Sequence, residues 1–481
     1  MSTCIQDDIH VVPRFLLNVG LRYEYNTPPV EALNRFSVPD LTANSATCTP
    51  VPDCQFIQAG TNGIPKATYS PSKTDFGPRL GFAWRPLKTE RWVVRSAYGV
   101  FWDSSIANIN IFPRINPPYY NLSFSQQNPF TCPGGLCTVQ DILSQPGGLV
   151  QDNMISPKFR DGYVQQWNAD LQYEVLPNWM VDAAYVGSKG THLSNVIDLN
   201  QVNPDTGPPF PQFASILYVE SSANSSYNSL QLRSEKRTRN GLSLLLAYTY
   251  SKSCDDISSV FGGSVGAGLP QNSQDLAADR GPSDFNAVNR LSGSFVYDLP
   301  LHKLWKGGPT RLLGNWQAGG IITAQSGSPF TVVLAGASTS AGAAFGNPAR
   351  PDLVGAPFET TNASGCPTQL RVPQSWFNTC AFAFPAPGVI PNTFQFGTEG
   401  RNILTGPGYT NLDFGLAKSM TLGSESRRLE FRGDFFNLFN HPNFDIPAHV
   451  LGATNFGQIL SANSYGNKPP RQIQLSARYV F

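Results

Sequence analysis

The cysteines are the residues whose type and spacing most directly suggest chemistry in this 481-residue chain. Six of the eight form three local pairs: Cys48 with Cys54, Cys132 with Cys137, and Cys366 with Cys380. A zinc site needs Cys and His sets that converge on four ligands. No CxxC motif occurs, and no histidine lies near any pair. The spacing therefore favours loop disulfides over free thiols or a metal site, and disulfides indicate an oxidising compartment.

The histidines and glycine-rich runs give little support for catalysis. A nucleophile needs an adjacent base and an orienting group, and no histidine lies beside a GxSxG motif. His441 and His449 flank prolines, so no helix sets a metal-binding geometry for them. The run 261–268 lacks the Lys-Ser/Thr of a phosphate-binding loop. The sequence predicts no enzyme, no metal site and no cofactor.

Composition excludes further classes of function. Lys and Arg number 34 against 33 Asp and Glu, so the net charge of +1 provides no basic surface for nucleic acid. The 43 glycines and 40 prolines disfavour a helical fold, and 12% aromatic residues argue against disorder. No stretch approaches the 18 or so apolar residues of a membrane-spanning helix. The first residues lack the basic and apolar regions of a secretion signal.

Apolar and polar residues alternate along many segments, which predicts β-strands. Phe15, Leu17, Val19 and Leu21 share one face, for example, while Asn18 and Arg22 lie on the other. Strands are expected at 14–25, 78–86, 91–102, 163–175, 178–187, 228–237, 241–252, 289–299, 314–326, 410–420, 428–438 and 471–481. Most are about as long as the 9–11 residues that a membrane-crossing strand needs.

The predicted connections alternate between short and long. Short ones follow the strands that end at 86, 175, 237 and 420, while long ones fill 26–77, 103–162, 188–227, 253–288, 327–409 and 439–470. Short turns on the periplasmic side and long extracellular loops are typical of outer-membrane barrels. We therefore expect an all-β, antiparallel, up-and-down transmembrane β-barrel of about twelve strands. An even count predicts that both termini are periplasmic.

The second face of the predicted strands is polar and carries both signs of charge. In a wide barrel such a face lines a hydrated lumen, where charges contact a plug or a passing solute. The alternative is that they form cross-strand ion pairs that set register. The candidate lumen-facing residues are Arg22, Glu24, Arg95, Asp170, Glu174, Arg233, Glu235, Arg237, Arg290, Glu430, Arg432 and Asp434.

Several motifs carry a resemblance to one family. They are 13–25 (PRFLLNVGLRYEY), 185–193 (YVGSKGTHL), 279–286 (DRGPSDFN) and 430–444 (EFRGDFFNLFNHPNF). The chain ends in an alternating strand with Tyr479 and Phe481, which resembles the signal read by barrel-assembly machinery. Together, over nearly the whole chain, these segments resemble the Oar-like TonB-dependent transporters.

The resemblance implies an outer-membrane protein of a Gram-negative-type bacterium, in contact with lipid. Family members carry a signal peptide, a regulatory-like domain, a plug and a barrel of about twenty-two strands. Residues 1–481 are expected to correspond to the C-terminal part of such a barrel, arising from a gene fragment, a split gene or a truncated gene model. TonB would act only through the missing plug, and missing N-terminal strands would complete the wall.

The function that the resemblance implies is uptake or passage of a solute, such as a carbohydrate or a peptide, captured by the long loops. Two alternatives remain open. One is a non-transporting surface barrel whose loops mediate adhesion, and the other is a soluble secreted all-β binding protein.

Overall fold

A computed structural model describes residues 1–42, 56–104, 112–119, 151–211, 213, 215–237, 241–259, 268–304, 308–334, 348–391, 393–422, 424–462 and 470–481. One large sheet dominates it, and thirteen of its strands follow each other in an unbranched path. Every neighbouring pair on this path is antiparallel. The all-β, antiparallel, up-and-down prediction is therefore confirmed.

The thirteen strands include all twelve that the sequence predicts. In order they are β1 (Ser2–Val12), β2 (Phe15–Glu24), β5 (Asp75–Trp84), β6 (Trp92–Asp103), β8 (Gly162–Leu176), β9 (Trp179–Asp198), β10 (Ser215–Arg237), β11 (Leu242–Asp255), β13 (Asn289–Leu299), β14 (Trp316–Gln325), β20 (Tyr409–Leu422), β21 (Ser424–Phe436) and β23 (Gln472–Val480).

Smaller elements lie between these strands. Two join the large sheet at its side: β7 (Gln151–Ile155) pairs with β10, and β12 (Gly281–Pro282) pairs with β11. Short two-stranded sheets are formed by β3 (Ser37–Pro39) with β4 (Phe56–Gln58), β15 (Pro329–Phe330) with β19 (Leu404–Thr405), β16 (Val333–Leu334) with β22 (Val450–Leu451), and β17 (Asp352–Leu353) with β18 (Phe382–Ala383).

Helical structure is scarce among the described residues. There the α-helices are α3 (Leu301–Leu304) and α4 (Thr310–Leu313), and the 3₁₀ turns are η2 (Phe112–Ile115), η3 (Leu276–Asp279) and η4 (Thr379–Ala381). In the part of the chain that the structure describes, no helix is long and apolar enough to cross a membrane.

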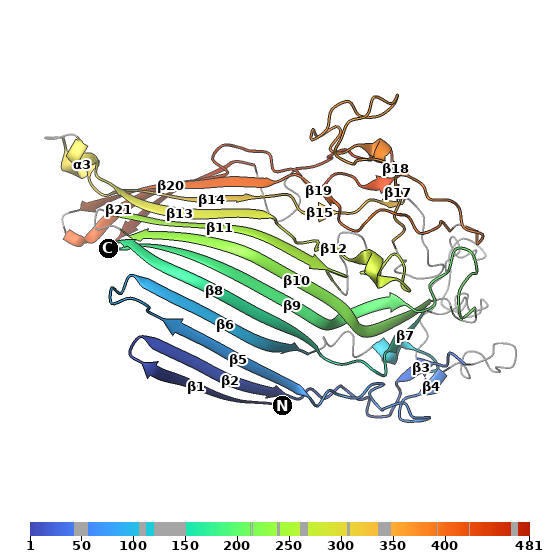
Figure 1. Cartoon of the computed structure of the whole chain (residues 1–481). Coiled ribbons are helices and arrows are strands. Elements are labelled where there is room, and N and C mark those ends of the chain that lie inside the picture. The colour runs from blue at the N-terminus through green and yellow to red at the C-terminus, as the bar shows by residue number, and fades with distance from the viewer. Residues whose placement is uncertain are drawn as a thin grey trace.

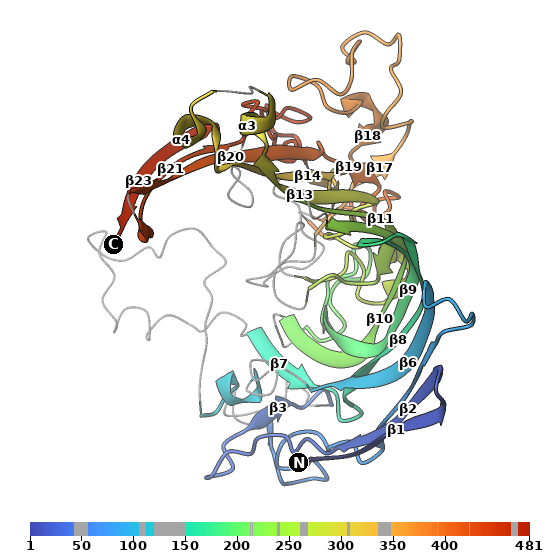
Figure 2. The ribbon, with the colours of Figure 1, turned by 90° about the vertical axis from the view of Figure 1, so that its left-hand side faces the viewer.

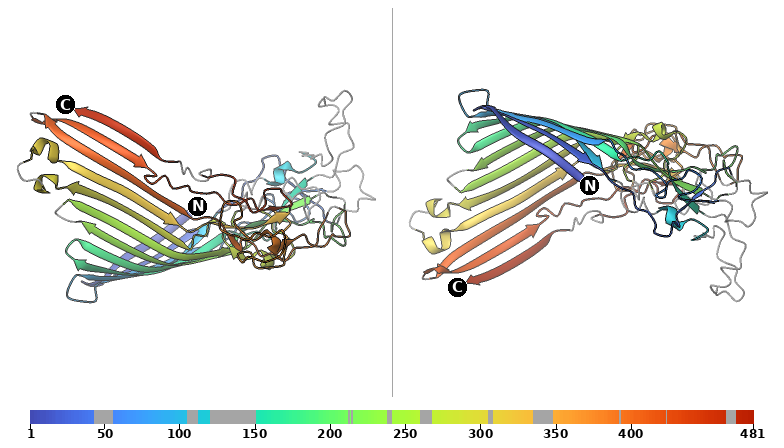
Figure 3. Two further views of the ribbon diagram at one scale, coloured as in Figure 1. Left: turned by 90° about the horizontal axis from the view of Figure 1, so that it is seen from above. Right: turned by 90° about the horizontal axis from the view of Figure 1, so that it is seen from below.

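The sheet curves into an open trough, with β1 along one rim and β23 along the other (Figure 2). Long connections gather at one end of the strands and short ones at the other (Figures 1 and 3). The predicted alternation of short and long connections is thus present in the structure. Figure 1 shows the N-terminus at the loop end and the C-terminus at the short-turn end.

The strand β1 was not predicted, and it corrects the prediction for the termini. Ile5 and Ile9 alternate on one side of it, but Asp7 lies between them and interrupts the apolar pattern. An added strand makes the number odd, so the expectation that both termini are periplasmic is wrong. The backbone confirms the position of the N-terminus, because the Met1 amine donates to the Tyr25 carbonyl at 2.8 Å, beyond the loop end of β2.

The predicted loop 188–227 is mostly strand. Here β9 and β10 continue past the length of their neighbours, and only 199–214 connects them. The extension is stabilised by apolar burial, because Val196, Leu217 and Val219 pack with Ile155 and Phe159. Ser188 and Lys189, expected at the start of a loop, therefore lie inside β9. Likewise Cys254, expected in a loop, lies near the end of β11.

The well-packed cores lie among the loops rather than between layers of sheet. One surrounds Ile155 and Val219, as described above. The other joins β15 and β19 to the segment around η4, through Phe330, Phe377, Phe382 and Leu404. Phe330 and Phe377 are fully buried, whereas many large apolar side chains of the main sheet are exposed. Burial therefore stabilises the loop end, while the sheet offers an apolar surface to its surroundings.

Candidate functional site

The main sheet has one polar face and one apolar face. Residues directly opposite each other in antiparallel strands point to the same side, so the register of the twelve pairs assigns each residue to a face. Every candidate lumen-facing residue falls on the polar side: Arg22, Glu24, Arg95, Asp170, Glu174, Arg233, Glu235, Arg237, Arg290, Glu430, Arg432 and Asp434. The opposite side carries residues such as Leu80, Leu171, Leu230 and Leu246, which are exposed.

Most of these charges pair along one strand rather than across strands. On β10, Glu235 accepts from both Arg233 and Arg237 at 2.7 Å. On β21, Arg432 pairs with Asp434 at 2.8 Å, and on β2 Arg22 pairs with Glu24. The arginine side chains in these pairs are 42 to 77% exposed. Exposed pairs contribute about 0–1 kcal/mol each, so they add little to stability.

The remaining predicted charges behave differently from one another. Arg95 lies opposite Asp170 on the next strand, with 3.4 Å between Nη1 and Oδ2. Glu430 pairs with Arg428 at 2.6 Å. Glu174 accepts from the Asn178 backbone N–H in the turn between β8 and β9.

Sequence reasoning missed some charged residues on the same face. Arg79 lies opposite Gly20 and Gly99, and Asp182 lies opposite Arg233. Asp413 lies opposite Ile321 in β14. The alternation that identified their strands also assigns them to the polar face, so the signal was present in the sequence.

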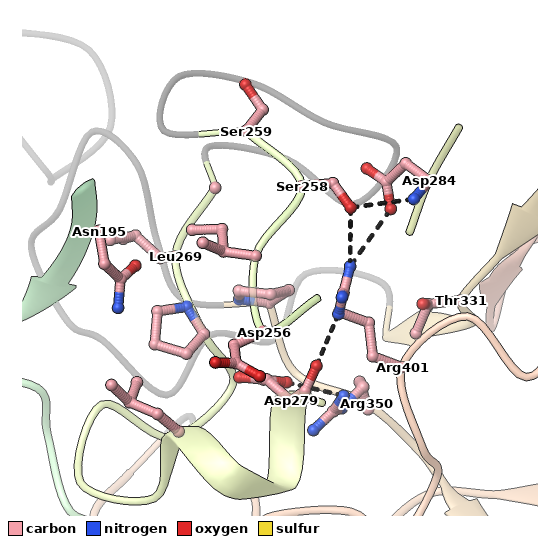
Figure 4. Close-up of a pocket in the computed structure, with 15 residues that line it drawn as sticks. Asn195, Asp256, Ser258, Ser259, Leu269, Asp279, Asp284, Thr331, Arg350 and Arg401 are labelled. Carbon is pink, nitrogen blue, oxygen red and sulfur yellow. Dashed lines mark hydrogen bonds and ion pairs between the residues drawn. The ribbon is translucent and has the colours of Figure 1, made fainter. Parts of the chain in front are cut away.

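A second group of charges lies among the loops and contains the 279–286 motif (Figure 4). Arg401 donates to the backbone carbonyl of Asp279 at 2.7 Å, to the carboxylate of Asp255, and to Asp284 at 3.5 Å. Arg350 pairs with Asp279 at 2.8 Å. All these side chains are at most 17% exposed.

This buried cluster is a structural anchor rather than a solute site. The cavity beside it measures about 40 Å³, too small for a sugar, and its arginines are bonded within the protein. Burial raises the pKa of Asp279, and the Arg350 guanidinium opposes that shift. The motif thus holds strand ends and loops together.

Two other carboxyls near the loop end of the sheet, one in β7 and one in a loop, are buried without full hydrogen bonding among the described residues. Burial raises the pKa of Glu399 to about 8, although its Oε1 accepts from the Val332 N–H and Arg350 favours the charged form. Its Oε2 has no hydrogen-bond partner among the described residues. Burial also raises the pKa of Asp152 to about 8, and neither of its oxygens has a hydrogen-bond partner in the part of the chain that the structure describes. Both groups are therefore mostly protonated at neutral pH.

Cys366 and Cys380 form a disulfide with their Cα atoms 5.7 Å apart. It joins two parts of the segment that surrounds η4, next to the core around Phe377. The other proposed pairs, Cys48 with Cys54 and Cys132 with Cys137, lie outside the described residues. Cys4 and Cys254 are free.

The proposed assembly signal lies at the open rim of the sheet. Tyr479 is opposite Leu429 and so belongs to the apolar face. Its ring stacks on Phe481 with 5.7 Å between the ring centroids, and Phe481 is 90% exposed.

Comparison with known proteins agrees with this fold. Residues 2–474 match the family described as the outer membrane beta barrel domain. Among solved structures, the outer membrane transporter YddB from Escherichia coli matches 100% of this chain and 44% of its own, with 12% identity and a TM-score of 0.50. The chain thus spans less than half the length of this structure. No curated protein sequence matches the chain.

Two further solved structures match with lower TM-scores. The FrpB iron transporter from Neisseria meningitidis (F5-1 variant) matches 100% of this chain and 45% of its own, with 11% identity and a TM-score of 0.45. The ferripyoverdine receptor of the Pseudomonas aeruginosa outer membrane matches 100% of this chain and 38% of its own, with 10% identity and a TM-score of 0.45.

Proposed function

Because the chain belongs to the outer membrane beta barrel domain family, we propose that it forms part of the wall of a TonB-dependent transporter barrel, through which a solute crosses the outer membrane. The chain is an outer-membrane protein that meets lipid with its strands. The continuous polar face is the observation that carries the proposal. In this setting the apolar face contacts lipid and the polar face lines a hydrated lumen.

The open rims support the view that 1–481 is the C-terminal part of a larger wall. In the described chain, β1 and β23 each pair with one neighbour. An unpaired edge in lipid leaves backbone groups unsatisfied at several kcal/mol each. The rims therefore either close on each other in a smaller barrel or pair with further strands. We propose the second arrangement, for which the 44% share of the YddB chain leaves length.

A wall of this kind would contact several partners. The Oar-like subtype remains part of it, because the motifs at 185–193 and 279–286 carried that resemblance. A plug would lie against the polar face, and TonB would act through the plug. Barrel-assembly machinery would read Tyr479 and Phe481. The loops would capture the solute, a carbohydrate or a peptide, and no residue of this wall would catalyse a reaction.

Membrane fractionation of the full chain in a Gram-negative host tests the location, and vesicle swelling tests the function. We expect it in the outer membrane, released by detergent and migrating faster in gels when unheated. Solubility without detergent would overturn the membrane assignment. The chain should be produced together with any sequence encoded in frame upstream of it and reconstituted into vesicles. These vesicles should swell in an isotonic sugar. Swelling no greater than that of protein-free vesicles would contradict passage.

The loop module offers a test of the adhesion alternative. Residues 329–334 and 348–404 contribute most of an apolar core, which Ile446, Leu451 and Phe456 complete, and they carry a disulfide. Deleting 327–409 should leave membrane assembly intact. Loss of binding to surfaces on deletion, with no change in solute passage, would favour adhesion over transport.

A further inference from the structure

Arg79 lacks the carboxylate partner that most arginines of the polar face have within the described chain. It lies on β5, and within the described chain no carboxylate or other hydrogen-bond acceptor pairs with it. Its Nε atom is buried and has no hydrogen-bond partner in the described structure. Arg22, Arg95, Arg233 and Arg432 all have a carboxylate partner. An unpaired guanidinium on a lumen wall keeps its donors free for an anion.

The guanidinium is held in one orientation by Phe101. Its Cζ lies 4.8 Å from the centre of the Phe101 ring, within the range of a cation–π contact. The ring in turn leans over Gly99: a Cβ at that position would lie 2.9 Å from Phe101 Cε2. A larger residue at 99 would displace the ring, so glycine here permits the stack. Arg79 is thereby preorganised, which lowers the entropy cost of binding.

A hollow of about 530 Å³ opens beside this stack on the polar face. Its size falls within the roughly 300–1,000 Å³ of small-molecule sites. Gly20, Gly81 and Ala97 leave the space because their side chains are absent or small. Among the described residues that line it, Arg79 is the one charged side chain.

Amide side chains surround the hollow. Asn18 donates to Asp8 at 2.6 Å, and Gln6, Gln166 and Asn168 line the same hollow. Amides both donate and accept, which suits hydroxyl groups. A planar guanidinium binds a carboxylate through two parallel bonds. A smaller hollow on the other side of the stack shares Arg79 and Phe101, and its Glu24 is already paired with Arg22.

We propose that this hollow binds a hydroxyl-rich carboxylate of the sugar-acid class, with Arg79 on the carboxylate and the amides on the hydroxyls. This rests on the proposed function for the lumen position of the polar face. It goes further by naming a site on the wall and the chemical class of its ligand.

Titration of the detergent-solubilised full chain with galacturonate tests the site by calorimetry. Galacturonate should bind, and galactose should bind at least about tenfold more weakly, because it lacks the charge-assisted bonds. Arg79→Gln should weaken galacturonate binding to a similar extent. Arg290→Gln is the matched control, since Arg290 lies on the same face, has no ion pair in the described chain and lines neither hollow.

A second variant separates loss of the site from loss of folding. Ala97→Leu fills the hollow and keeps the charge of Arg79, so it should also weaken galacturonate binding. Gel mobility before heating should match the parent in both variants. The proposal would be overturned if galactose bound as tightly as galacturonate, or if Arg79→Gln left galacturonate binding unchanged. Preference for an acidic dipeptide over galacturonate would also overturn it. Vesicle swelling in a neutral sugar does not depend on Arg79. If the parent protein fails to bind galacturonate but its vesicles still swell, this site is rejected and the proposed function stands. Retained Arg79-dependent binding without swelling would reject passage alone.

Discussion

Arg401 and Asp255 meet although 146 positions separate them in the chain. The Nη2 atom of Arg401 donates to the Asp255 backbone carbonyl at 2.7 Å and also reaches its carboxylate. Asp255 is the last residue of β11, whereas Arg401 belongs to the long connection between β14 and β20. One guanidinium therefore fixes this loop to the end of the sheet.

Replacing Arg401 should release that loop. Arg401→Gln leaves the buried carboxylate of Asp255 without its cation, and removing one partner of a buried pair costs about 3–5 kcal/mol. Hydrogen exchange of 348–404 should accelerate accordingly, while the strands of the main sheet stay protected. Arg280→Gln is the control, because Arg280 is 49% exposed in its pair with Asp256, and such pairs contribute about 0–1 kcal/mol. Equal acceleration in both variants would contradict the anchor.

Glu399 should make the same loop less stable as pH rises. Its folded pKa of about 8 lies above its ordinary value of 4.5, so between these two values the folded loop binds a proton that the unfolded loop has lost. The stabilisation is complete below about pH 4.5 and is lost progressively up to about pH 8, by at most about tenfold in the opening equilibrium per pH unit. Proteolysis of 348–404 across this range measures it, and Glu399→Gln should flatten the profile. A profile that is steep in the variant as well would exclude Glu399 as the cause.

Reduction of the Cys366–Cys380 disulfide should loosen the module around η4. The bridge closes a loop with a sequence separation of 14, and a loop of that size contributes about 3 kcal/mol by restricting the unfolded chain. Paired Cys366→Ser and Cys380→Ser substitutions should raise proteolysis of this module and leave the gel mobility of the unheated chain unchanged. The free Cys4→Ser variant provides the control, with no expected change. Resistance equal to that of the parent would show that the core around Phe377 is sufficient.

The strands and their faces were predictable because a lipid-facing sheet must alternate strictly. Leu230 and Leu232 lie on one face and Arg233 and Glu235 on the other, which is visible in the sequence alone. The strand β1 was not predicted because Asp7 interrupts the apolar alternation. It lies at the rim, where β1 has a neighbour on one side only in the described chain.

The loop architecture was not predictable, because it depends on contacts between distant segments. Arg401 and Asp255, or Phe330 and Phe377, carry no local signal of their pairing. The same limit applied to Arg79. Its strand and face follow from alternation. Its contact with Phe101, and its lack of a carboxylate partner among the described residues, appear only when β5 and β6 are placed side by side.

Phe481 should matter for assembly rather than for stability. It is 90% exposed and contacts Tyr479, so Phe481→Ala removes little packing. If barrel-assembly machinery reads this residue, insertion of the variant into the outer membrane should slow, as followed by pulse-chase and gel mobility. Phe439→Ala, at an exposed phenylalanine beyond the end of β21, should insert at the normal rate. Identical insertion kinetics for all three proteins would refute the signal.

Leu245 and Leu246 give the sharpest test of the two faces. They are adjacent in β11, yet Leu245 lies opposite Glu235 on the polar face, whereas Leu246 lies opposite Gly293 on the apolar face. An arginine on the lipid face near the bilayer midplane costs about 2–4 kcal/mol, while lumen positions tolerate charge. Leu246→Arg should therefore reduce the folded fraction in phospholipid vesicles strongly. Leu245→Arg, which gains Glu235 as a neighbour, should have a small effect. Because the two variants share residue type and strand, equal losses would mean that both faces meet the same surroundings. That result would favour a soluble sheet over a membrane wall.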